Sequence, residues 1–175
     1  MNSSRGRVYT LQPDRERFGV YADQVAYMDE QVARLLDLVA DLPAEVADAV
    51  PEGGENSIHA LCLHMAWAER HWLARTVTGE VLPSGDRPRF VLPADAGDRA
   101  WADLRATLVD ERAAHVHAVI ADVAAGRATF TAAPQFAELG LLLEHLKWHW
   151  VYHSGQVGLL RRLLGPRYSW TFATP

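Results

Sequence analysis

The sequence is poor in cysteine and in long apolar runs, and each shortage excludes a class of protein. Cys62 is the only cysteine among 175 residues, so the chain can form neither an internal disulfide nor a metal site with several thiolate ligands. Nowhere do 18 apolar residues follow one another, and the first residues contain no apolar stretch of signal-peptide length. We therefore expect a soluble, cytoplasmic protein with no membrane partner.

No long run of one charge occurs either. The chain has 17 basic and 22 acidic residues, which gives a formal net charge of −5. Proteins that bind nucleic acids owe much of their affinity to neutralised phosphates, so this balance speaks against a nucleic-acid partner. Hydrophobic residues make up 49% of the chain, as in ordinary folded proteins. We expect a single domain over residues 1–175, with a core at about 14–165 and peripheral tails.

Four segments carry apolar residues at helical spacing, which predicts an all-α fold. Ser57 or Asn56 can cap the second segment, and Gly79 can end it. Asp98 is the expected cap of the third segment, and Pro134 suits the first turn of the fourth. The predicted helices cover about residues 14–40, 57–78, 99–125 and 134–164.

The connection between the second and third helices, residues 80–97, is unusually long. It carries three prolines and two glycines and cannot be helical throughout. A chain of this length can reach ~60 Å, whereas the second helix spans only ~33 Å. The connection can therefore run the length of a bundle and leave the helices on either side parallel. The sequence thus predicts a four-helix bundle with a long crossover between helices two and three.

Histidines follow one another at four-residue intervals in the last predicted helix: His145, His149 and His153. Each step turns the helix by about 40°, so neighbouring imidazoles share a face and two of them can chelate one divalent ion. His145 and His153 are about 12 Å apart along the axis, so one ion can take only an adjacent pair. Spacing alone leaves both neighbours of His149 open as its partner.

A further histidine, His64, lies on the second predicted helix. It would add a third neutral nitrogen and leave coordination positions open, as catalytic metal sites usually do. The alternative for the three histidines of the last helix is that they are half-buried residues hydrogen-bonded to the backbone or to Glu144. We do not expect Cys62 or Glu69 of the second helix to be metal ligands. Cys62 points about 200° away from His64 around the helix. Glu69 is expected to pair with Arg70 or Arg75.

Two stretches resemble the DinB/YfiT-like metal-binding four-helix-bundle superfamily. HWVYHSGQ, residues 149–156, is similar to the motif of that family's last helix, and SIHALCLHMAWAERHW, residues 57–72, is similar to its second helix. The order and spacing of the four predicted helices also match across about residues 14–165. The chain departs from the pattern at Ser154, where many members have arginine.

Position by position, the resemblance implies that His64, His149 and His153 are the metal ligands and that His145 is not one. His145 remains a candidate for moving protons near the site. Gln156 lies three residues after His153 and can hydrogen-bond a ligand imidazole, although a surface amide is an equal alternative.

The resemblance also implies a function. The cofactor is a divalent metal ion, with zinc or nickel favoured and iron as an alternative, because imidazole suits all three. Several members are transferases or isomerases that use a low-molecular-weight bacterial thiol. We therefore expect a metal-dependent enzyme of the thiol S-transferase or hydrolase kind, acting on a small molecule and forming a homodimer. The alternative is a non-catalytic, metal-binding, stress-related helical protein that acts through dimerisation or partner binding.

Overall fold

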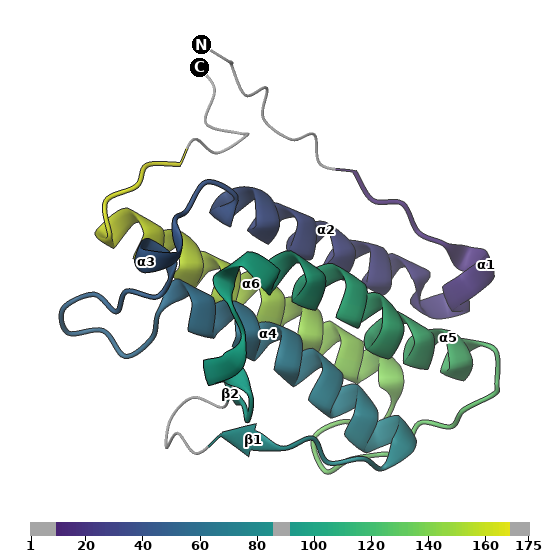
Figure 1. Ribbon diagram of the computed structural model, residues 1–175. Helices are drawn as coiled ribbons and strands as arrows, with labels where there is room; N and C mark the ends of the chain where they lie inside the picture. The colour runs from purple at the N-terminus through teal and green to yellow at the C-terminus, as the bar shows by residue number, and fades with distance from the viewer. Residues whose placement is uncertain (1–9, 86–91, 169–175) are drawn as a thin grey trace.

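The computed structural model describes residues 10–85 and 92–168 (Figure 1). Helices dominate these residues, which confirms the predicted all-α fold. The predicted peripheral tails include residues 1–9 and 169–175, which lie outside the described residues. In chain order the elements are α1 (Arg15–Phe18), η1 (Gly19–Tyr21), α2 (Ala22–Val39), α3 (Ala44–Ala47), α4 (Ile58–Leu73), η2 (Ala74–Thr78), β1 (Ser84–Gly85), β2 (Leu92–Pro93), η3 (Ala96–Asp98), η4 (Trp101–Asp103), η5 (Ala106–Glu111), η6 (Ala113–His117), α5 (Ala118–Ala124) and α6 (Leu139–Leu163).

Local sequence signals set both ends of the second helical segment. The Ser57 hydroxyl accepts a hydrogen bond of 3.1 Å from the backbone N–H of Ala60, so the predicted cap at Ser57 is confirmed. Beyond α4 the chain continues through the π-helical turn η2 to Thr78. Gly79 then adopts a φ of +75°, which favours glycine, and the helix ends there as predicted.

Two predicted helix starts were wrong. Asp98 lies inside the 3₁₀ turn η3, where its backbone N–H bonds to the carbonyl of Asp95, and its side chain caps no helix. Pro134 lies in a turn that Ala133 and Phe136 close with reciprocal backbone hydrogen bonds of 3.0 Å. That turn uses the backbone groups a helix would need, so α6 begins only at Leu139.

The helices flanking the long connection run in the same direction. The ring of His59, near the start of α4, packs on Trp101 with 5.3 Å between centroids. Further along both segments, Glu69 of α4 pairs with Arg112. The later residue of one segment contacts the later residue of the other, so the two segments are parallel. Figure 1 shows this for α4 and the segment ending in α5. The connection includes residues 86–91, outside the described residues, so its complete path stays a prediction.

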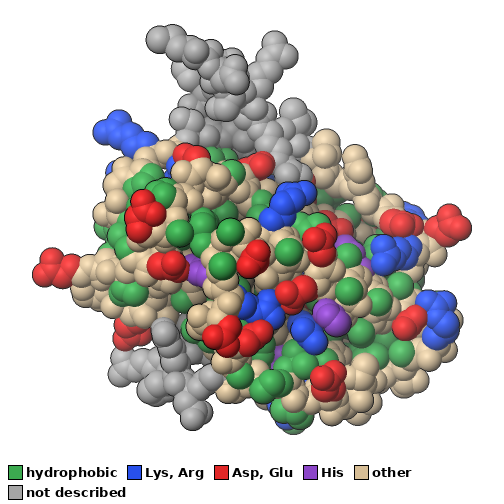
Figure 2. Space-filling model, in the orientation of Figure 1, with side chains coloured by type: hydrophobic (Ala, Val, Ile, Leu, Met, Phe, Trp, Pro, Cys, Tyr) green, Lys and Arg blue, Asp and Glu red, His purple; other side chains and the backbone are tan. Residues whose placement is uncertain are grey.

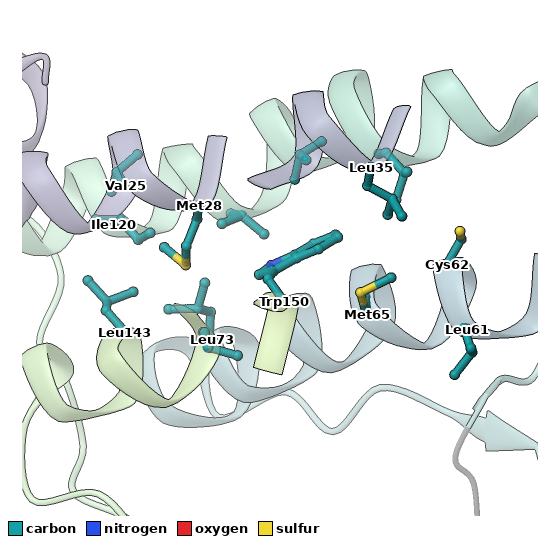
Figure 3. Packing of buried hydrophobic residues seen from close by; sticks show 14 of the residues in the cluster. Val25, Met28, Leu35, Leu61, Cys62, Met65, Leu73, Ile120, Leu143 and Trp150 are labelled. Atoms are coloured by element: carbon teal, nitrogen blue, oxygen red, sulfur yellow. The ribbon is translucent and has the colours of Figure 1, made fainter. Parts of the chain in front are cut away.

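A hydrophobic cluster joins all the long helical segments. Trp150 of α6 is fully buried, and Figure 3 shows its ring among side chains of α2 and α4, including Met28 and Met65. Cys62 belongs to the same cluster, where burial raises the pKa of its thiol to about 12. Cys62, the only cysteine of the chain, therefore packs in the hydrophobic core and is not suited to act as a nucleophile. Among the described residues, every helix is too short or too polar to cross a membrane.

Candidate metal centre

His64, His149 and His153 come together between α4 and α6. The Nε2 atoms of His64 and His149 are 3.0 Å apart. The ring centroid of His153 lies 4.9 Å from that of His64 and 4.4 Å from that of His149. One nitrogen from each ring can be chosen so that all three lie within 4.8 Å of one another. The structure thus brings together the three histidines that the family resemblance singled out.

Antiparallel packing of α4 against α6 produces this meeting. Near the end of α4, Trp72 packs edge-on against Phe136, which precedes α6, with 5.4 Å between centroids. Moving back along α4 therefore corresponds to moving forward along α6. His64 lies two turns before Trp72 and so meets the middle of α6, where His149 and His153 are one turn apart.

Gln156 fixes the tautomer of the His153 imidazole. Its side-chain oxygen, Oε1, accepts a hydrogen bond of 2.6 Å from Nδ1 of His153. Because Nδ1 donates, the neutral ring carries its proton there and keeps a lone pair on Nε2. An imidazole held in this tautomer by a partner on the same helix is ready to act as a metal ligand.

Burial keeps the centre of the cluster neutral. His149 is only 9% exposed, and this burial, helped by the nearby His153, His64 and His145, lowers its pKa to about 3. Burial also lowers the pKa of His153, although its hydrogen bond to Gln156 acts in the opposite direction. Metal ions bind imidazole only when it is neutral, so protons compete weakly for these nitrogens near pH 7.

The geometry and chemistry of the cluster fit a divalent ion. Two nitrogens at 2.0–2.1 Å from one ion, with angles between right and tetrahedral, are separated by about 2.8–3.4 Å. The 3.0 Å between His64 and His149 falls in this range. Nδ1 of His149 is buried and has no hydrogen-bond partner within the described residues. Three neutral nitrogens and no carboxylate or thiolate make a donor set that suits zinc, nickel or iron.

His145 lies outside this cluster. Its ring centroid is 6.2 Å from that of His149, and it packs instead against Phe136 at 5.2 Å and Trp148 at 5.8 Å. Burial lowers the pKa of His145, so its ring is neutral near pH 7. The hydroxyl of Ser154 is buried and has no partner in the described part of the chain.

Aromatic rings border the cluster on the surface of α6. Trp148 and Tyr152 stack with 5.1 Å between centroids and an interplanar angle of 17°, and both are about half exposed. The ring of Tyr152 in turn makes a T-shaped contact with His153, with 5.1 Å between centroids. The two rings thus form an exposed apolar surface next to the histidine cluster.

A buried charge network on the far side of α4 was not anticipated. Glu69 is fully buried and bonds Arg112 through both carboxylate oxygens, at 2.8 and 3.0 Å, so its expected pairing with Arg70 or Arg75 was wrong. The sequence held a signal for this, because Glu69 follows Cys62 by seven residues and therefore shares its core-facing side of the helix. A carboxylate in that position needs a charged partner from another helix.

The network continues from Arg112 to α2. Arg112 also pairs with Asp29, which receives a second hydrogen bond, of 2.8 Å, from Nε2 of His117. Burial alone would raise the pKa of Asp29, but the hydrogen bond from His117 and the charge of Arg112 hold it below its ordinary value. Burial alone would likewise lower the pKa of Arg112, whereas Glu69 and Asp29 raise it.

The chain matches a known protein family. The family model described as the DinB superfamily matches residues 27–157, which is well over half of the chain. The matched range contains α4 and most of α6, and so all three clustered histidines. A comparison with curated proteins found no match.

Proposed function

Because this chain belongs to the DinB superfamily of metal-binding proteins, we propose that His64, His149 and His153 hold a divalent metal ion in a catalytic site. The observation that carries the proposal is the convergence of three imidazoles, from two helices, with donor nitrogens within 4.8 Å. Three protein ligands leave coordination positions for a substrate or water, as catalytic sites require. Zinc and nickel are the ions we favour, and iron is the alternative.

A dication held by neutral ligands makes a bound water or thiol more acidic, which suits hydrolysis or thiol transfer. The residues of this chain would contribute binding and orientation. Gln156, for example, keeps the His153 ring in one tautomer. We therefore propose a thiol S-transferase or hydrolase acting on a small molecule, with a low-molecular-weight thiol as the cosubstrate of the transferase.

The first test is elemental analysis. We expect about one equivalent of zinc, nickel or iron in the purified protein and a large loss in His149→Ala. The matched control is His115→Ala, which removes an exposed histidine outside the cluster. Equal metal content in His149→Ala and the unmodified protein would contradict the proposed site. A panel of electrophilic aromatic substrates with different cellular thiols, and a panel of esters and amides, would then separate transferase from hydrolase.

A second candidate function rests on the outer face of α6. Apolar side chains repeat there at intervals of seven and four residues and remain about half exposed or more: Leu141, Trp148, Tyr152, Leu159 and Leu163. Such spacing places them along one stripe of the helix, which is the pattern that pairs helices. We propose that this α6 stripe joins two copies of the chain in a homodimer. A non-catalytic, stress-related protein would use the same stripe for dimerisation or partner binding, and absence of turnover across both panels despite bound metal would favour it.

Two broader expectations stay predictions. The first is that residues 1–175 form one DinB-like domain, of which the family match covers residues 27–157. The second is a cytoplasmic location. Fractionation of the native cells tests the second, and limited proteolysis that leaves a stable core of about residues 14–165 would agree with the first.

A further inference from the structure

A cavity lies beside α4, on a different side of that helix from the histidine cluster. It has a volume of about 330 Å³ and is lined by α4, by both sides of the β1–β2 hairpin and by the helical segment that contains Arg112. His64, His149 and His153 are not among its lining residues. Arg70, which does line it, projects about 120° around α4 from His64. The cavity is therefore separate from the candidate metal centre.

Apolar residues form part of the walls of this cavity. They include Leu63, Leu82 and Val116, which are buried, and Trp67, whose ring also stacks on His71 with 4.5 Å between centroids. The indole N–H of Trp67 donates a hydrogen bond of 3.1 Å to the carbonyl of Pro83, which ties the ring to the segment that leads into β1. A pocket of this size with an aromatic side is typical of small-ligand sites.

The charges around the cavity differ in how they are satisfied. Arg112 is neutralised by Glu69 and Asp29, and Arg99 by Asp95 and Glu111, with N···O distances of 2.9–3.0 Å for the Arg99 pairs. Arg70 also lines the cavity, but within the described residues it makes neither an ion pair nor a hydrogen bond. Figure 2, which has the orientation of Figure 1, shows acidic and basic side chains side by side near the centre of the view.

We propose that this cavity binds a small organic monocarboxylate with an aromatic or apolar body. Its carboxylate pairs with Arg70, whose planar guanidinium matches the two carboxylate oxygens, and its body lies against Trp67. A dianion is disfavoured, because Glu80 and Glu111 also line the cavity and would repel a second negative charge. The site binds its ligand independently of metal at the histidine cluster.

Isothermal titration with phenylacetate tests the proposal on the full chain. We expect a dissociation constant of millimolar or tighter, about tenfold or more weaker binding by benzyl alcohol and phenyl phosphate, and a similar loss in Arg70→Gln. The matched control is Arg75→Gln, which removes an exposed arginine outside the cavity and should leave the affinity unchanged. His149→Ala should also bind phenylacetate normally, which separates this site from the proposed metal site.

A second variant tests the location without touching charge. Ala66→Leu adds three carbons to a residue that lines the cavity and should weaken phenylacetate about tenfold or more while Arg70 remains. Circular dichroism confirms that each variant is folded. The proposal is overturned if phenylacetate does not bind, if Arg70→Gln or Ala66→Leu binds it as tightly as the unmodified protein, if benzylamine binds more tightly than phenylacetate, or if His149→Ala abolishes binding.

Discussion

Nε2 of His64 and Nε2 of His149 lie 3.0 Å apart, although 85 residues separate the two histidines along the chain. At this distance two neutral imidazoles meet either by one N–H donating to the other lone pair or by both lone pairs facing a cation. The same positions therefore serve a hydrogen-bonded pair without metal and a ligand pair with it. Little rearrangement is needed between the two states, which favours tight binding.

The hydrogen bond between Gln156 and His153 should contribute to metal affinity. Replacing Gln156 by leucine removes the acceptor that holds the His153 tautomer, and losses of about tenfold to a hundredfold are typical for such partners. Competition with a chromophoric chelator measures the change for zinc. Gln24→Leu is the matched control, because the Gln24 amide bonds Gly140 and Glu144 rather than the cluster. An unchanged zinc affinity in Gln156→Leu would show that the contact plays no part in metal binding.

The buried pair of Glu69 and Arg112 should be costly to break on one side only. Arg112→Met leaves the Glu69 carboxylate buried without its partner, so we expect a loss of about 3–5 kcal/mol in the free energy of unfolding. The double variant with Glu69→Met should recover much of this loss. Arg127→Met is the control, since its pair with Asp122 is solvent-exposed and should contribute about 1 kcal/mol or less. Urea unfolding measures all four proteins, and a double variant no more stable than Arg112→Met would refute the coupling.

Asp29 should make stability depend on pH in acid. Its folded pKa lies below the ordinary value of 3.8, so the unfolded chain binds more protons than the folded one as the pH falls through that range. The stabilisation from Asp29 is thus complete above about pH 5 and is lost as the pH falls through the folded pKa. Asp29→Asn should be less stable than the unmodified protein by about 1 kcal/mol at pH 6, a modest value because the side chain is 42% exposed.

The difference between Asp29→Asn and the unmodified protein should shrink as the pH is lowered from 5 to 3. Urea midpoints at several pH values measure it. Glu16→Asn serves as the reference for an exposed carboxylate and should show a small, nearly constant difference. A gap between Asp29→Asn and the unmodified protein that widens toward pH 3 would mean that the carboxylate is not held ionised by Arg112 and His117.

Features that depend on a few neighbouring residues were predictable from sequence. Ser57 caps α4 and Gly79 ends its extension because both act through their own backbone and the next turn. Asp98 and Pro134 failed as helix starts because short turns, closed by backbone hydrogen bonds, came between them and the helices. Propensity alone does not reveal such turns.

Long-range partners were predictable only where something besides spacing indicated them. The four-residue repeat showed that His149 had two possible neighbours, and the resemblance singled out His153 and His64. For Glu69, the helical position indicated burial, but nothing in the sequence identified Arg112 as the partner. Arg70 at the cavity beside α4 was equally hidden, because only the folded arrangement shows that the neighbouring carboxylates of the described residues pair with Arg99 and Arg112 instead.

The α6 stripe leads to a prediction about assembly. If it joins two copies of the chain, a charge in its middle must be desolvated in the dimer without a partner. Leu159→Lys, at a position 56% exposed in the single chain, should therefore weaken the dimer about a hundredfold or more. Val20→Lys is the matched control, because Val20 is 83% exposed but lies on η1 and is not part of the α6 stripe. Sedimentation equilibrium distinguishes the outcomes: a dimer in the unmodified protein and in Val20→Lys, with a monomer in Leu159→Lys, supports the interface. A monomer in all three would contradict the homodimer, and a dimer in all three would place its interface elsewhere on the surface.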